Sequence, residues 1–113
     1  MKSLILILVM GSLSCSKHVL QTMRVPLCIQ QQIGTFKSEP KGYPPQSIIQ
    51  FTYHNKRVFY IPAQCCDQYS LVLDENCSVI GHPDGGIAGG GDGKPANFFK
   101  DATDSVTIWK DDR

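Results

Sequence analysis

The sequence predicts an α+β domain in which one N-terminal helix packs on a small antiparallel sheet of about five strands, held by two disulfides. Three observations indicate this class. A segment with helical apolar spacing comes first, short runs that alternate apolar and polar residues follow it, and four cysteines remain beyond the first 15 residues.

The helix is expected over residues 26–37. Pro26 suits the first helical position, and Ile29, Ile33 and Phe36 recur on one helical face, with Cys28 at its edge. Residues 39–45 contain three prolines and a glycine, so they form a connector.

The first hairpin is expected around the turn signal Asn55-Lys56. Apolar residues alternate with polar ones over 49–54, and residues 57–61 are rich in β-branched and aromatic types. One face of its sheet should stay exposed, because a single short helix cannot cover both, and this face would suit a protein partner or a second copy.

A second hairpin is expected from residues 69–73 and 77–80, which flank the turn residues 74–76. Val106, Ile108 and Trp109 indicate a fifth strand near the C-terminal end.

Residues 1–14 read as an export signal, with Lys2, a short apolar run and small residues. The run is shorter than the roughly 20 residues that a membrane-spanning helix needs. Ser12-Leu13-Ser14-Cys15 resembles a lipobox, although Ser12 stands where a branched aliphatic residue is usual. We therefore expect lipidation at Cys15, with a palmitate-type acyl chain, and a lipid-anchored tether over residues 15–24.

The disulfide-stapled domain then covers residues 25–113. The expected location is the bacterial cell envelope, on the periplasmic or surface side; the alternative is a secreted protein with an ordinary signal peptide.

Two disulfides are expected among Cys28, Cys65, Cys66 and Cys77, because export leads to an oxidising compartment. A bond between the neighbours Cys65 and Cys66 is strained, which favours joining Cys28 to one of them and Cys77 to the other. A zinc site that uses Cys65, Cys66, Cys77 and His82 is the alternative, and its ligand spacing is atypical.

Charge indicates no nucleic-acid partner, since 11 basic and 10 acidic residues are scattered without a basic run. Contact with the membrane is expected only through the lipid anchor.

The segment from Pro83 to Pro95 holds six of the ten glycines within nine residues. It is the candidate binding loop, with its residues Asp84, Gly85, Gly86, Gly91, Asp92 and Gly93. Three interpretations are open: a structural connection whose aspartates cap their own backbone, a protruding loop that enters a partner, and a calcium site. Two carboxylates fall short of the six to eight oxygens that calcium takes, so no metal or cofactor is assigned.

No catalytic residue is assigned either. His18, His54 and His82 are the only histidines, and no serine lies in a Gly-x-Ser-x-Gly turn. We do not expect an enzyme.

Cys65-Cys66-Asp67, Pro83-Asp84-Gly85-Gly86 and Gly91-Asp92-Gly93 occur in this order. With the terminal Ile108-Trp109 region, they resemble a domain-of-unknown-function family of small bacterial envelope lipoproteins. The resemblance covers about residues 25–113 and implies no established activity. It also implies that relatives carry cysteines where this chain has Gly81 and Pro95, so residues 82–97 should be looser here.

The functional expectation is an envelope lipoprotein domain of unknown function that acts as a non-enzymatic binding or structural module on an unknown protein partner. The alternatives are a periplasmic enzyme inhibitor that uses the glycine-rich loop and a calcium-stabilised module.

Overall fold

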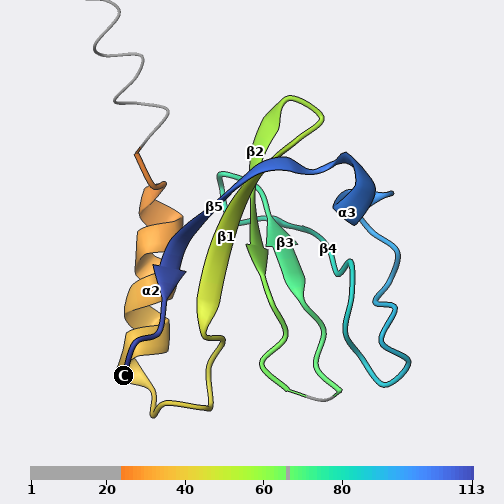
Figure 1. Ribbon diagram of the computed structural model, residues 1–113. Coiled ribbons are helices and arrows are strands. Elements are labelled where there is room, and N and C mark those ends of the chain that lie inside the picture. Colours follow the sequence, from red (N-terminus) through yellow and green to blue (C-terminus); the bar gives the residue numbers. More distant parts are fainter. Residues whose placement is uncertain (1–23, 66) are drawn as a thin grey trace, which may run out of the picture.

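A computed structural model describes residues 24–65 and 67–113 (Figure 1). The expected export signal, Cys15, the expected tether up to residue 23 and Cys66 lie outside the described residues. Within the described ranges, neither helix has the length and apolar character needed to traverse a bilayer.

The predicted α+β class is confirmed. Helix α2 (Leu27–Ser38) is followed by strands β1 (Ser47–Tyr53), β2 (Lys56–Ile61), β3 (Leu71–Leu73) and β4 (Val79–Gly81), then by helix α3 (Phe98–Asp101) and strand β5 (Thr103–Lys110). The five strands form one antiparallel sheet in the order β4-β3-β2-β1-β5.

Helix α2 begins one residue later than expected, with Pro26 as its N-cap, and it buries Ile29 and Phe36 against the sheet. At its other end, the guanidinium of Arg113 donates to the carbonyl oxygens of Phe36, Lys37 and Glu39 at 3.4, 3.3 and 2.8 Å. Asp111 holds this guanidinium at 3.0 Å. The hydrogen bond from Arg113 lowers the pKa of the Asp111 carboxyl. The last carbonyls of the helix thus find donors in the C-terminal segment.

The first hairpin turns one residue earlier than predicted. His54 and Asn55 form the turn with φ of 49° and 63°, and Tyr53 pairs with Lys56. Two left-handed residues give a two-residue loop whose twist matches that of the strands, and asparagine tolerates this conformation.

The second hairpin is shorter than predicted. Strand β3 begins at Leu71 rather than at residue 69, and β4 begins at Val79 rather than at residue 77. The Oδ1 atom of Asp74 accepts the amide hydrogens of Asn76 and Ser78, both at 2.9 Å, and Cys77 has a φ of 61°. These bonds keep residues 74–78 as a turn.

The expectation of an open sheet face is wrong. Helix α2 covers one face, where Ile29 and Phe36 pack with Ile48, Phe59, Ile61 and Leu73. On the opposite face Phe98 of α3 is buried with Tyr53, Val58, Tyr60 and Val72. The phenol of Tyr53 also donates to the carbonyl oxygen of Ala96, which brings the segment before α3 onto this face.

The predicted disulfide pairing is also wrong. Cys28 of α2 is bonded to Cys77 of the β3–β4 turn, with Cα atoms 6.1 Å apart, and it is the one bridge found among the described residues, where two were expected. Cys65 is not a free thiol. Because the Cys28 sulfur is engaged with Cys77, Cys77 is not available as the thiolate ligand of the alternative zinc site.

Candidate functional site

The glycine-rich stretch, residues 82–97 and called the glycine segment below, folds back onto the start of β3. Gly85 bridges to Tyr69 and to Gly90, and the amide of Gly86 donates to the carbonyl oxygen of Gln68 at 2.9 Å. The amide of Gly91 donates to the carbonyl oxygen of Gly85 at 3.0 Å. The segment is therefore anchored by backbone hydrogen bonds to the strand and to itself.

Close approach to other backbone requires glycine at Gly81 and Gly91, as it does at Gly85. A Cβ on Gly91, whose φ is 62°, would overlap the carbonyl oxygen of His82. A Cβ on Gly81 would overlap the backbone of Lys94 and Pro95. Gly81 and Pro95 are thus neighbours in this fold, and they meet by direct backbone contact.

Asp84 connects the segment to the middle of the sheet. The phenol of Tyr60 donates to its carboxylate, 2.9 Å from Oδ1 and 3.0 Å from Oδ2. The hydroxyl of Ser70 donates to the backbone oxygen of Asp84 at 3.0 Å. Burial raises the pKa of the Tyr60 phenol, and the hydrogen bond to Asp84 and its negative charge raise it further.

Asp92 links the beginning of the glycine segment to its end. Its Oδ1 atom accepts the amide hydrogens of His82 and Lys94 at 2.9 and 2.8 Å. The hydrogen bond from His82 lowers the pKa of the Asp92 carboxyl most, and the one from Lys94 adds to it. Both aspartates of the predicted binding loop therefore bind protein donors. In the described ranges, no group of three or more His, Cys, Asp or Glu residues is placed to hold a metal ion.

Ser70, His82 and Asp84 meet without forming a proton relay. The Nδ1 atom of His82 lies 2.8 Å from the backbone oxygen of Ser70, and Ser70 is fully buried with 0% exposure. The Ser70 hydroxyl contacts backbone atoms of Asp84, not the imidazole. A nucleophilic serine needs its hydroxyl against a base and open to substrate, so this cluster serves to join β3 to the glycine segment.

A domain of unknown function (DUF6970) matches residues 34–111. The chain belongs to this family. No curated protein and no solved structure matches it. The matched range of the DUF6970 domain contains all five strands, the glycine segment and α3.

The glycine segment of this DUF6970 domain presents one large apolar side chain to solvent. Ile87 is 94% exposed, and Tyr69, which lies against the preceding residue, is 55% exposed. The Tyr69 ring lies against Gly86, where any Cβ would meet it, and 5.5 Å from the His82 ring. We call Tyr69 and Ile87 the Tyr69–Ile87 patch.

The sequence analysis identified the residues that hold the glycine segment in place, but it did not identify the side chain that the segment exposes to solvent. Asp84, Gly85, Gly86, Gly91 and Asp92 make hydrogen bonds that hold the segment to its neighbours or to itself, and Gly93 faces open space. The signal for Ile87 was available, because an isoleucine isolated among six glycines has no periodic apolar partner that would bury it.

Proposed function

We propose that this DUF6970 chain is a non-enzymatic binding module of the bacterial cell envelope, lipid-anchored at Cys15, that contacts a protein partner through the Tyr69–Ile87 patch. The observation that carries the proposal is the exposure of Ile87, at 94%, on a segment fastened to the sheet. An apolar side chain held in place loses little further conformational freedom on binding, which favours affinity.

The position of the patch agrees with this use. The chain enters α2 at one end of the molecule, the top in Figure 1, whereas the glycine segment extends toward the bottom of the same view. A domain tethered through residues 15–24 would present the segment away from its anchor.

The proposal is tested with Ile87→Asp in the full chain, produced in an exporting bacterial host. We expect proteins cross-linked to the wild-type domain in envelope extracts to be lost with Ile87→Asp, because a buried carboxylate opposes apolar contact. The control is Val106→Asp on β5, which replaces an apolar residue of 52% exposure and should retain the partner.

If Ile87→Asp and wild type recover the same cross-linked proteins in equal amounts, the proposed role of the Tyr69–Ile87 patch is wrong. An inhibitor would be recognised by recovery of a single hydrolase in stoichiometric amount. The anchor is tested separately by mass spectrometry of the mature N-terminus, where an unmodified peptide that begins away from Cys15 would contradict it.

A further inference from the structure

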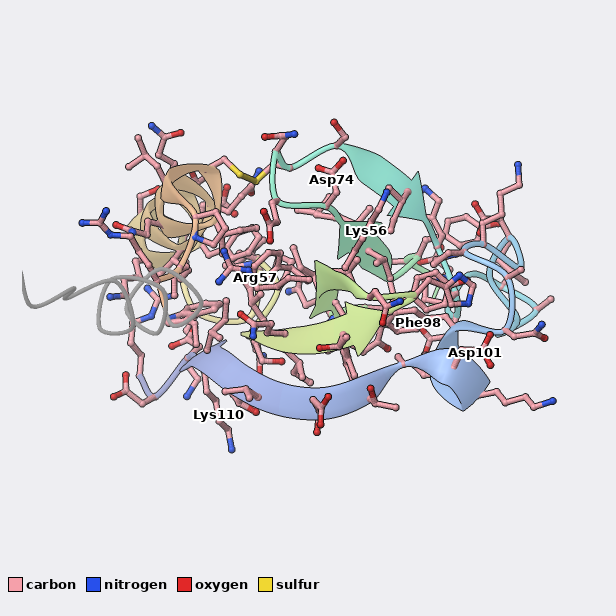
Figure 2. All side chains as sticks on the ribbon, turned by 90° about the horizontal axis from the view of Figure 1, so that it is seen from above. Lys56, Arg57, Asp74, Phe98, Asp101 and Lys110 are labelled. Carbon is pink, nitrogen blue, oxygen red and sulfur yellow. A yellow bond between two sulfur atoms is a disulfide. The ribbon has the colours of Figure 1, made fainter. Side chains whose placement is uncertain are left out.

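A second surface feature lies at the end of the sheet where the chain enters α2. A cleft of about 580 Å³ separates the tip of the β1–β2 hairpin from the β3–β4 turn. Figure 2 looks down on this end and shows Lys56 and Asp74 on the two facing hairpins. The cleft is lined by Tyr53, His54, Asn55, Lys56, Arg57, Val58, Asp74, Glu75, Asn76 and Ile80.

Both walls of this hairpin cleft are held in place. On the first wall, His54 stacks on Tyr53 with ring centroids 3.9 Å apart, and its Nε2 atom lies 3.1 Å from Oδ2 of Asp101. Arg57 donates to Glu75 at 3.2 Å and so joins the first wall to the second. The second wall is further fixed by the Cys28–Cys77 bond. The cleft is therefore preformed, as small-ligand sites usually are.

The charges around the cleft cancel. Lys56 and Arg57 contribute two cations, and Asp74 and Glu75 contribute two carboxylates. An anion or a cation would meet as many repulsive as attractive charges, so the lining does not favour a net charge on the ligand.

Donors and acceptors nevertheless remain on the rim. Within the described part of the chain, no protein group bonds the Lys56 ammonium or the side-chain amides of Asn55 and Asn76. The Oδ2 atom of Asp74 and the Oε2 atom of Glu75 also accept no hydrogen bond there. The floor between them is apolar; Ile80, which is partly exposed, supplies most of it, because Val58 is only 2% exposed.

We propose that the hairpin cleft binds a neutral saccharide. A sugar ring carries hydroxyls that both donate and accept at its edge and a C–H surface on its face, and it has no net charge. These properties match a rim of mixed donors and acceptors over an apolar floor. The site is separate from the Tyr69–Ile87 patch and does not depend on the proposed partner.

The isotope-labelled full chain is purified in the form that the cell produces, in a detergent without a sugar headgroup. It is then titrated with chitotriose in its neutral, fully N-acetylated form. We expect saturable shifts of backbone amide signals confined to residues 53–58 and 74–80, with a Kd on the order of 1 mM. The double variant Lys56→Ala and Asn76→Ala should raise this Kd at least about tenfold. The control Lys110→Ala, on β5, should leave it unchanged.

The double variant removes side chains without protein partners, so an unchanged melting temperature will show that its fold is intact. Absence of shifts at about 10 mM chitotriose would overturn the proposal, as would shifts outside the cleft or equal affinity in the double variant. Tighter binding of the zwitterion triglycine in the same cleft would also overturn it and indicate a peptide ligand.

Discussion

The phenol oxygen of Tyr60 lies within 3.0 Å of both carboxylate oxygens of Asp84, which joins a central strand to the glycine segment. This bond crosses from β2, beyond β3, to a stretch that is otherwise attached by backbone bonds and by the hydroxyls of Ser70 and Tyr53. Tyr60 also contacts the rings of Phe98 and Phe99 at 5.8 and 5.5 Å. One side chain therefore secures both the segment and the helix that follows it.

Tyr60→Phe should reduce the free energy of unfolding by about 1 to 3 kcal/mol, because it removes the donor to a carboxylate and keeps the ring. Urea denaturation of both proteins measures the difference. The matched control is Tyr43→Phe, since Tyr43 is 75% exposed and its hydroxyl makes no hydrogen bond among the described residues. A Tyr60→Phe midpoint equal to that of the control would contradict the role of the bond.

Because the pKa of Tyr60 is raised in the folded state, the protein should lose stability at alkaline pH. Folding raises the pKa of Tyr60, so the folded state favours the neutral phenol, and the unfolded chain ionises at about pH 10. This contribution is complete below about pH 10 and is lost as the pH rises above it toward the pKa of the folded state. Thermal unfolding at a series of alkaline pH values should show the melting temperature falling more steeply for wild type than for Tyr60→Phe. Parallel curves would contradict a contribution from the Tyr60 phenol.

Phe98→Ala should reduce the free energy of unfolding by about 3 to 5 kcal/mol, because it leaves a cavity in the hydrophobic cluster on the sheet face opposite α2. Phe98 is 2% exposed, and its ring lies 5.4 Å from that of Phe51. Phe99→Ala is the control, since Phe99 is 56% exposed and should cost clearly less. Similar losses for both variants in chemical denaturation would mean that α3 does not close this face.

Gly81→Ala and Gly34→Ala should act in opposite directions. The first places a Cβ into the backbone of Lys94 and Pro95 and should lower the melting temperature. The second meets no atom within 4 Å and should stabilise helix α2 by roughly 0.5 to 1 kcal/mol. Calorimetry of the two variants compares them, and a Gly81→Ala protein as stable as wild type would refute the close contact.

Replacing Cys28 and Cys77 together by serine should cost about 4 kcal/mol, as expected for opening a loop whose ends are 49 residues apart. Denaturant unfolding under oxidising conditions measures the loss. The same comparison under a reductant serves as the control, because the difference between the proteins should then largely disappear.

The local sequence pattern predicted the individual helices and strands better than it predicted which of them contact each other. The spacing of Ile29, Ile33 and Phe36 identified α2, and alternation identified the β1–β2 hairpin, because each pattern follows from the geometry of its own element. The pairing of Cys28 with Cys77 depends on how α2 meets the β3–β4 turn, which spacing along the chain does not encode.

The covered second face was missed for a related reason. Helix α3 has four residues, too few to show a helical period, and it begins at Phe98 after Asn97 with a φ of 53°. The glycines indicated turns correctly, but the contacts of Asp84 depend on Ser70 and Tyr60, which lie 14 and 24 residues away in sequence. Exposure of Ile87 could be anticipated, whereas the hairpin cleft required the register of four strands.

The placement of β5 has a consequence for self-association. Strand β1 is rich in apolar residues, and without β5 it would be the edge of the sheet, a template for pairing with other chains. Strand β5 covers it with two register shifts against β1 and with largely polar, exposed residues. A chain cut before Thr103 would therefore aggregate through β1, whereas the irregular strand at the finished edge is a poor template for further growth.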